Sequence, residues 1–109
     1  MRTKLCLGTA QFGMNYGITN LMGKPKDNEI DSIIESALNN NIFYFDTANA
    51  YGNSERILGD KLKNNHDIKY ITKFNSGVKN TFSEADINKL EKNFEKTLKR
   101  LKTNNIDSL

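Results

Sequence analysis

The sequence predicts an α/β fold that is built on a parallel sheet. Short apolar runs alternate along the chain with longer segments in which apolar residues recur at helical spacing. The run Ile42–Phe45 is apolar without interruption, which is typical of a strand covered on both faces. Strands that alternate with helices are joined by right-handed crossovers, so we expect the strands to lie parallel.

The first part of the chain predicts a strand, a loop and a helix. Residues 5–7 form a short apolar run, and residues 10–26 indicate a loop because they hold three glycines and the only proline. Asp27 is suited to cap a helix, and Asn41 can take the left-handed conformation that ends one. The expected buried stripe of this helix comprises Ile30, Ile33, Ile34, Ala37 and Leu38.

The second part predicts two further helices and two further strands. A helix begins near residues 53–54, and residues 68–74 form the next strand. Ser83, with Asp86 three residues later, forms a capping-box pattern that opens a long helix. Residues 106–109 resemble the start of another strand. The expected buried stripe of the long helix comprises Ile87, Leu90, Phe94, Leu98 and Leu101.

Two architectures fit this order of elements. A doubly wound open sheet often carries a glycine-rich first turn, but the first turn here reads GTAQFG (residues 8–13) and lacks the G-x-G-x-x-G fingerprint. A (β/α)8 TIM barrel needs about 250 residues, of which this chain supplies about three and a half βα units. Residues 1–109 are therefore interpreted as one domain or as the N-terminal portion of one.

Composition argues against several classes of partner. The net charge is +3, but the lysines are scattered among acidic residues, so we expect neither nucleic acid nor a membrane surface as a partner. One histidine and one cysteine cannot form a zinc site, so no metal is expected. Cys6 is predicted to be a small core residue, and His66 a solvent-exposed one. No apolar segment suggests a signal or a membrane span, and a cytoplasmic location is expected.

Several chemically useful residues follow the predicted strands. Gly8 and Thr9 end the first strand, Asp46 ends the second, Tyr51 lies in the loop after it, and Lys73 lies at the end of the third. In a parallel barrel the chemistry collects at the carboxyl ends of the strands. The sequence therefore predicts that these positions share one rim.

An acid, a phenol and an amine on one rim suit the reduction of a carbonyl group. Hydride addition produces an alkoxide, which needs a positioned proton donor. Tyr51 would donate that proton, Lys73 would stabilise the phenolate left behind, and Asp46 would keep the lysine charged and oriented. Taken singly, each residue also has a structural interpretation: Asp46 as an acceptor for loop amides, Tyr51 as a loop anchor, and Lys73 as a surface residue.

These residues lie in segments that resemble the N-terminal part of the aldo-keto reductases. The pattern D-T-A-x-x-Y-G, followed by S-E and L-G, is specific, and the matching segments occur in the right order over nearly the whole chain. The opening GTAQFGMNYGI (residues 8–18) is most similar to bacterial members associated with cell-surface sugar pathways. The segments that carry the resemblance are residues 7–13, 45–55, 58–59, 71–73, 98–101 and 105–109.

The resemblance implies a (β/α)8 barrel that reduces an aldehyde or ketone to an alcohol, with sugar-derived carbonyls as one substrate class. NADPH is the implied cofactor, and NADH is the less common one. Asp46, Tyr51 and Lys73 match the family's catalytic aspartate, tyrosine and lysine. The positions that match cofactor-contacting residues are Gly8, Thr9, Ala10 and Asp46.

One member of the family's catalytic set has no counterpart here. The family's histidine follows the fourth strand, whereas Leu109 comes before that strand is complete, and His66 is in the wrong place to substitute. We therefore expect residues 1–109 to be the N-terminal part of an aldo-keto reductase-like domain and to be inactive alone. The alternative is a non-catalytic fragment that self-associates through open sheet edges or acts as an interaction module.

Overall fold

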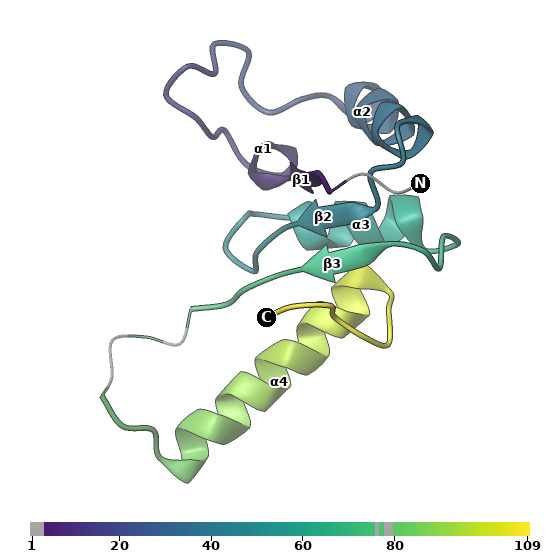
Figure 1. Ribbon diagram of the computed structural model, residues 1–109. Coiled ribbons are helices and arrows are strands. Elements are labelled where there is room, and N and C mark those ends of the chain that lie inside the picture. Colours follow the sequence, from purple (N-terminus) through teal and green to yellow (C-terminus); the bar gives the residue numbers. More distant parts are fainter. Residues whose placement is uncertain (1–3, 76, 78–79) are drawn as a thin grey trace.

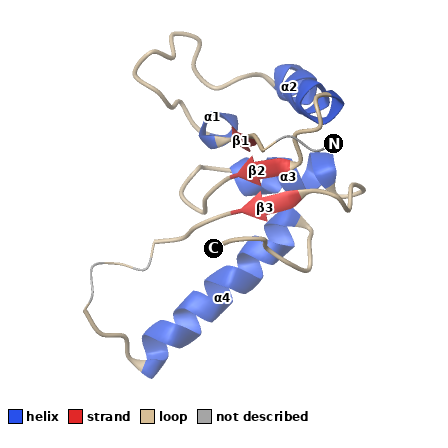
Figure 2. Ribbon diagram, in the orientation of Figure 1, coloured by secondary structure: helices blue, strands red, loops and turns tan. Residues whose placement is uncertain are grey.

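The computed structural model describes residues 4–75, 77 and 80–109, and it contains a parallel sheet with helices between the strands (Figures 1 and 2). The sheet has three strands in the order β1-β2-β3, and both strand pairs are parallel. This confirms the predicted α/β class. The elements in chain order are β1 (Cys6–Gly8), α1 (Ala10–Gly13), α2 (Asp27–Asn39), β2 (Tyr44–Asp46), α3 (Ser54–Leu62), β3 (Lys69–Ile71) and α4 (Glu84–Leu101).

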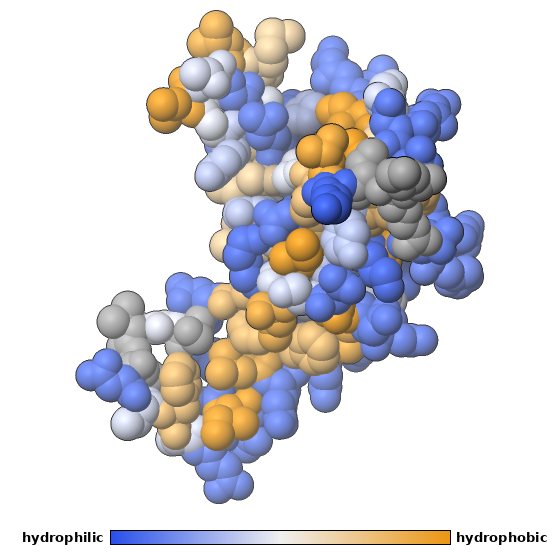
Figure 3. Space-filling view, in the orientation of Figure 1, coloured by the Kyte–Doolittle hydropathy of each residue, from blue (hydrophilic) through white to orange (hydrophobic). Residues whose placement is uncertain are grey.

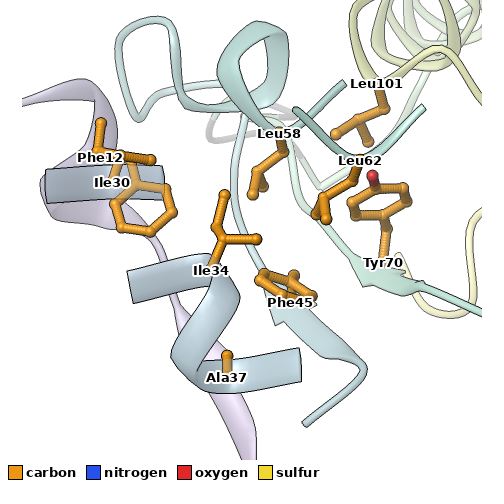
Figure 4. Close-up of a cluster of buried hydrophobic side chains, with 9 residues drawn as sticks. All are labelled: Phe12, Ile30, Ile34, Ala37, Phe45, Leu58, Leu62, Tyr70 and Leu101. Atoms are coloured by element: carbon orange, nitrogen blue, oxygen red, sulfur yellow. The ribbon is translucent and has the colours of Figure 1, made fainter. Parts of the chain in front are cut away.

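The core lies between one face of the sheet and the helices. Leu7, Phe45 and Tyr70 are register partners across the three strands, so their side chains share that face. Phe45 is fully buried there. The cluster drawn in Figure 4 brings together Phe12, Ile30, Ile34, Ala37, Phe45, Leu58, Leu62, Tyr70 and Leu101.

The opposite face of the sheet is less covered than the sequence predicted. Side chains alternate along a strand, so Cys6, Tyr44 and Asp46 point away from the face that holds Phe45. Tyr44 and Asp46 are half-buried, and Cys6 is exposed. The prediction that Cys6 is a core residue is therefore wrong, and the second strand is well covered on one face only. In a closed barrel this second face would look into the interior.

Local capping signals in the sequence were largely correct. Asn41 has a φ of 60°, in the left-handed region, just after α2. At the start of α4, the Asp86 amide donates to Ser83 Oγ at 3.2 Å and the Ser83 amide donates to Asp86 Oδ2 at 3.0 Å. Helix α2 begins at Asp27 itself and Lys26 is its cap, one residue earlier than predicted.

Helix α4 buries less of its apolar stripe than the sequence predicted. Figure 1 shows the helix running away from the sheet, so only its C-terminal end meets α3. Leu101 is buried there, whereas Ile87 is 49% exposed near the other end. Leu90, Phe94 and Leu98 are half-buried. Apolar side chains consequently show on the surface over α4 in the space-filling view (Figure 3).

The last residues of the chain continue the sheet. Ile71 and Ser108 form a parallel bridge, the Asp107 amide donates to the Tyr70 carbonyl at 2.9 Å, and the Thr72 amide donates to the Ser108 carbonyl at 3.0 Å. This confirms the expected onset of a further strand beside β3. The β3 ladder itself is shorter than residues 68–74. Across the described ranges, no helix has both the length and the apolar character needed to cross a bilayer.

Candidate active site

The carboxyl ends of the three strands bring the predicted acid and amine into contact. Asp46 is the last residue of β2, and Lys73 lies two residues after β3. Lys73 Nζ donates to Asp46 Oδ1 at 2.9 Å and to the Thr47 carbonyl at 2.8 Å. The two side chains are 50% and 35% exposed, so the pair is open to solvent and to a ligand.

Tyr51 joins this pair from the loop that follows β2. The Lys73 ammonium lies over the Tyr51 ring, 5.2 Å from the ring centroid, which is within the range of a cation–π contact. The loop is tied to the strand ends, because the Asn49 amide donates to the Lys73 carbonyl at 2.8 Å. The amide of Ser54 in turn donates to the Tyr51 carbonyl at 3.0 Å. Three predicted site residues therefore meet.

Two glycines hold the Tyr51 loop against the first turn of the chain. Gly52 has a φ of 54°, and a Cβ there would collide with the Gly13 carbonyl oxygen. A Cβ at Gly13 would likewise collide with the backbone oxygen of Tyr51. The two backbone segments touch directly, so any side chain at either glycine would displace the tyrosine.

A buried hydroxyl cluster lies beneath the site and was not predicted. Thr9 donates to the Asp46 carbonyl through its amide at 2.9 Å and through its hydroxyl at 2.8 Å. Thr47 Oγ1 donates to Ser54 Oγ at 3.0 Å, and Ser54 Oγ donates to the Thr9 carbonyl at 3.1 Å. All three side chains are fully buried. A signal was present, since Thr9 and Thr47 lie two residues after Leu7 and Phe45, whose side chains face the helices, and so share that face.

A buried ion pair was also missed. Glu55 Oε1 accepts from Arg100 Nε at 2.8 Å and lies 2.7 Å from Arg100 Nη2, and Glu55 Oε2 accepts from Thr72 Oγ1 at 2.9 Å. Thr97 Oγ1 is 3.4 Å from Glu55 Oε1. The Glu55 side chain is only 3% exposed. The network links α3 to α4 and to Thr72, the residue before Lys73.

An open hollow of about 440 Å³ lies beside the trio. A Cβ added to Gly8 would meet nothing within 4 Å, so this strand end leaves a flat, unobstructed surface. The hollow also includes an aromatic residue that sequence reasoning missed, Tyr16, whose ring centroid lies 6.3 Å from that of Tyr51 at an interplanar angle of 41°. The residues that line it are Gly8, Thr9, Ala10, Gln11, Tyr16, Asp46 and Tyr51.

The remaining candidate residues lie apart from the trio or have no assigned chemistry. His66 is exposed, as predicted, and lines a second hollow of about 410 Å³ formed by residues around the ends of α3 and α4. Partial burial, and then the charge of Asp46, raise the pKa of the Cys6 thiol above its usual value. Within the described part of the chain, no three metal-ligating side chains gather into a group that could hold an ion.

The parallel strand order and the connecting helices define a segment of a (β/α)8 barrel, with an acid, a phenol and an amine at the carboxyl ends of its strands. The family model described as "Aldo/keto reductase family" matches residues 4–109. The chain therefore belongs to the aldo/keto reductase family. This result confirms the resemblance seen in the sequence and selects the barrel over the doubly wound sheet.

Two solved structures of proteins designated as aldo-keto reductases from Pseudomonas aeruginosa are similar to this chain. The first has 31% sequence identity and a TM-score of 0.74, and the match covers 96% of this chain. The second has 30% identity and a TM-score of 0.71, also over 96% of this chain. This chain spans 40% and 39% of the length of the two neighbours. No curated protein sequence matches the chain.

Proposed function

We propose that residues 1–109 carry the proton-donating part of an NAD(P)H-dependent reductase that converts an aldehyde or ketone to an alcohol. The observation that carries this proposal is the position of Lys73. Its ammonium is hydrogen-bonded to Asp46 Oδ1 at 2.9 Å and lies 5.2 Å from the centre of the Tyr51 ring. A lysine fixed by a carboxylate and placed against a phenol is suited to assist loss of the phenol proton.

In this proposal Tyr51 is the general acid. Its O–H bond breaks as the carbonyl oxygen of the substrate gains negative charge, and the proton moves to that oxygen to give the alcohol. The Lys73 cation stabilises the phenolate that remains. Asp46 and the Thr47 carbonyl hold the lysine in place through bonds of 2.9 and 2.8 Å. The buried hydroxyls of Thr9 and Ser54 fix the strand ends beneath.

The residues present fit the nicotinamide end of a cofactor. The Gly8 strand end has free space where a Cβ would stand, beside the hollow that Ala10 and Asp46 also line, whereas the Thr9 side chain is buried beneath it. Gly8 itself carries no side chain that would hold a planar ring away from this strand end. When bound, the nicotinamide supplies the hydride that reduces the carbonyl carbon. We favour NADPH over NADH, and a cytoplasmic location, in which Cys6 stays reduced.

A hybrid barrel tests these roles. In it, residues 1–109 replace the matching 40% of the first Pseudomonas aeruginosa neighbour, which supplies the rest of the barrel. NADPH oxidation is followed at 340 nm with 4-nitrobenzaldehyde. We expect Tyr51→Phe and Lys73→Met each to lower kcat by about a hundredfold or more, because each removes part of the proton-donating pair.

Matched controls separate these roles from general damage. Tyr44→Phe and Lys69→Met make the same chemical changes on the same sheet but outside the trio, and we expect near-normal turnover from both. NADPH affinity should be largely retained in Tyr51→Phe. Near-normal turnover in both Tyr51→Phe and Lys73→Met would refute the proposed function. The chain of 109 residues alone is expected to show negligible turnover.

Self-association is the second candidate function, and the surface of α4 favours it. Ile87 on this helix is 49% exposed, and Phe82 just before it is 41% exposed. Exposed apolar patches on a protein surface often mark sites that contact another protein. Sedimentation velocity over a range of concentrations tests the idea: a rise in sedimentation coefficient that is lost in Ile87→Lys supports it, and a concentration-independent monomer refutes it.

A further inference from the structure

Tyr16 lies on the loop between α1 and α2, and side-chain amides hold its backbone in place. Gln11 Nε2 donates to the Tyr16 carbonyl at 3.0 Å, and Asn20 Nδ2 donates to the same oxygen at 2.9 Å. The Asn20 side chain also accepts from the Gly23 amide at 3.0 Å, which closes the loop on itself. These hydrogen bonds hold the backbone of Tyr16 in a defined position.

The side chain of Tyr16 reaches the site that holds Tyr51. Its ring is 6.3 Å from the ring of Tyr51, a distance typical of interacting aromatic pairs. Tyr51 thus has the Lys73 ammonium and the Tyr16 ring as neighbours. Tyr16 also lines the hollow beside Gly8 and Asp46, and 54% of its surface stays exposed.

The Tyr16 ring, whose backbone is held by these hydrogen bonds, is half exposed and lies next to the proposed acid, so it offers an apolar face to a molecule that enters the hollow. Apart from Tyr51, the proposed acid, the other residues that line the hollow are not aromatic, so Tyr16 supplies the only aromatic face that takes no part in the proposed proton transfer. A bound molecule whose carbonyl oxygen reaches Tyr51 would place the group attached to its carbonyl carbon within reach of Tyr16. A planar group there would gain contact area that a methyl group lacks.

We propose that Tyr16 is a substrate-specificity residue that favours carbonyl compounds carrying a planar apolar group, such as an aryl ring, on the carbonyl carbon. This inference rests on the proposed function, because it takes Tyr51 as the group that meets the carbonyl oxygen. It assigns the role of discriminating between substrates to Tyr16 and leaves the proton transfer to Tyr51.

Ligand binding without cofactor tests the proposal on the chain itself. The four tyrosines are replaced by 3-fluorotyrosine, and their 19F signals are assigned with single Tyr→Phe variants. Acetophenone is then titrated against acetone, the matching methyl ketone without a ring. We expect acetophenone to shift the signals of Tyr16 and Tyr51 and to leave those of Tyr44 and Tyr70 in place, with acetone giving weaker shifts.

Variants at the loop then separate the role of the ring from that of the loop. Tyr16→Ala should weaken acetophenone binding roughly threefold to tenfold, the range expected for the loss of one aromatic contact. Tyr16→Phe should retain the affinity. Ile18→Ala should retain it too, because Ile18 is fully exposed on the same loop. Circular dichroism verifies that each variant keeps the fold.

The outcomes are distinguishable from those of the reductase assay. Equal binding of acetophenone and acetone, or unchanged binding in Tyr16→Ala, would overturn the role of Tyr16, because binding is measured without turnover. Near-normal turnover in both Tyr51→Phe and Lys73→Met would instead overturn the proposed function.

Discussion

The buried ion pair between Glu55 and Arg100 provides the sharpest stability prediction. In Arg100→Met the aliphatic volume is largely kept, while the contacts of 2.8 and 2.7 Å from the guanidinium to Glu55 Oε1 are lost. The carboxylate, with its side chain 3% exposed, then stays buried with hydroxyl donors only, from Thr72 and Thr97. Removing one partner of a buried pair typically costs about 3–5 kcal/mol.

The structure places the expected loss at the lower end of that range. The Arg100 side chain is 26% exposed, so part of its attraction to Glu55 is already screened by water. Thr72 Oγ1 also continues to donate to Glu55 at 2.9 Å. We expect a loss of about 3 kcal/mol, which is a large share of the 5–15 kcal/mol that holds a typical domain folded.

Urea unfolding followed by circular dichroism at 222 nm measures this loss. With a slope of about 1.5 kcal/mol per molar urea, a loss of about 3 kcal/mol lowers the midpoint by roughly 2 M. Lys102→Met is the control, because its partner Asp60 is 54% exposed and such surface pairs contribute little to stability. In the double variant Glu55→Gln with Arg100→Met, the loss should be smaller than in Arg100→Met alone. A midpoint shift in Arg100→Met no larger than in Lys102→Met would refute the reasoning.

Two further predictions concern ionisation. Partial burial and the charge of Asp46 raise the pKa of the Cys6 thiol above 9.0. At pH 8, iodoacetamide should therefore alkylate this single cysteine more slowly than a free thiol, and Asp46→Asn should accelerate the reaction. Equal alkylation rates in the wild type and in Asp46→Asn would contradict this. Burial raises the pKa of Tyr70 to about 12 from an ordinary value of 10.0. Between about pH 10 and pH 12 the folded state therefore binds more protons than the unfolded state. The contribution of Tyr70 to the free energy of unfolding is complete below about pH 10 and falls by about 2 kcal/mol by pH 12. Urea midpoints at pH 9.5 and 11.5 should show a smaller decline for Tyr70→Phe than for the wild type, and equal declines would count against the assignment.

The sequence predicted those features that depend on short spacings or on topology. The left-handed Asn41 and the Ser83 cap are local, so nearby residues suffice to identify them. Asp46 and Lys73 lie far apart in the chain, but the rule that parallel strands end on one rim brought them together correctly. The order of strands and helices was enough for that step.

Features that depend on side-chain direction or on distant partners were missed. Cys6 was placed in the core because a short apolar run does not reveal which face each residue takes. Glu55 and Arg100 are 45 residues apart, and nothing in their local sequence indicates that they meet. The exposure of Ile87 follows from the direction in which α4 leaves the sheet, which helical periodicity alone does not determine.

The direct backbone contact between Gly13 and Gly52 holds the Tyr51 loop independently of the segment that follows Gly13. The residues after Gly13 form the segment that carries Tyr16, whereas the position of Tyr51 is fixed by the glycine contact and by the strand ends. Exchange of the segment between Gly13 and Pro25 for one of another length should therefore alter which molecules are accepted without moving the proton donor. For protein engineering, this segment can be exchanged to change substrate preference while Asp46, Tyr51 and Lys73 keep their positions.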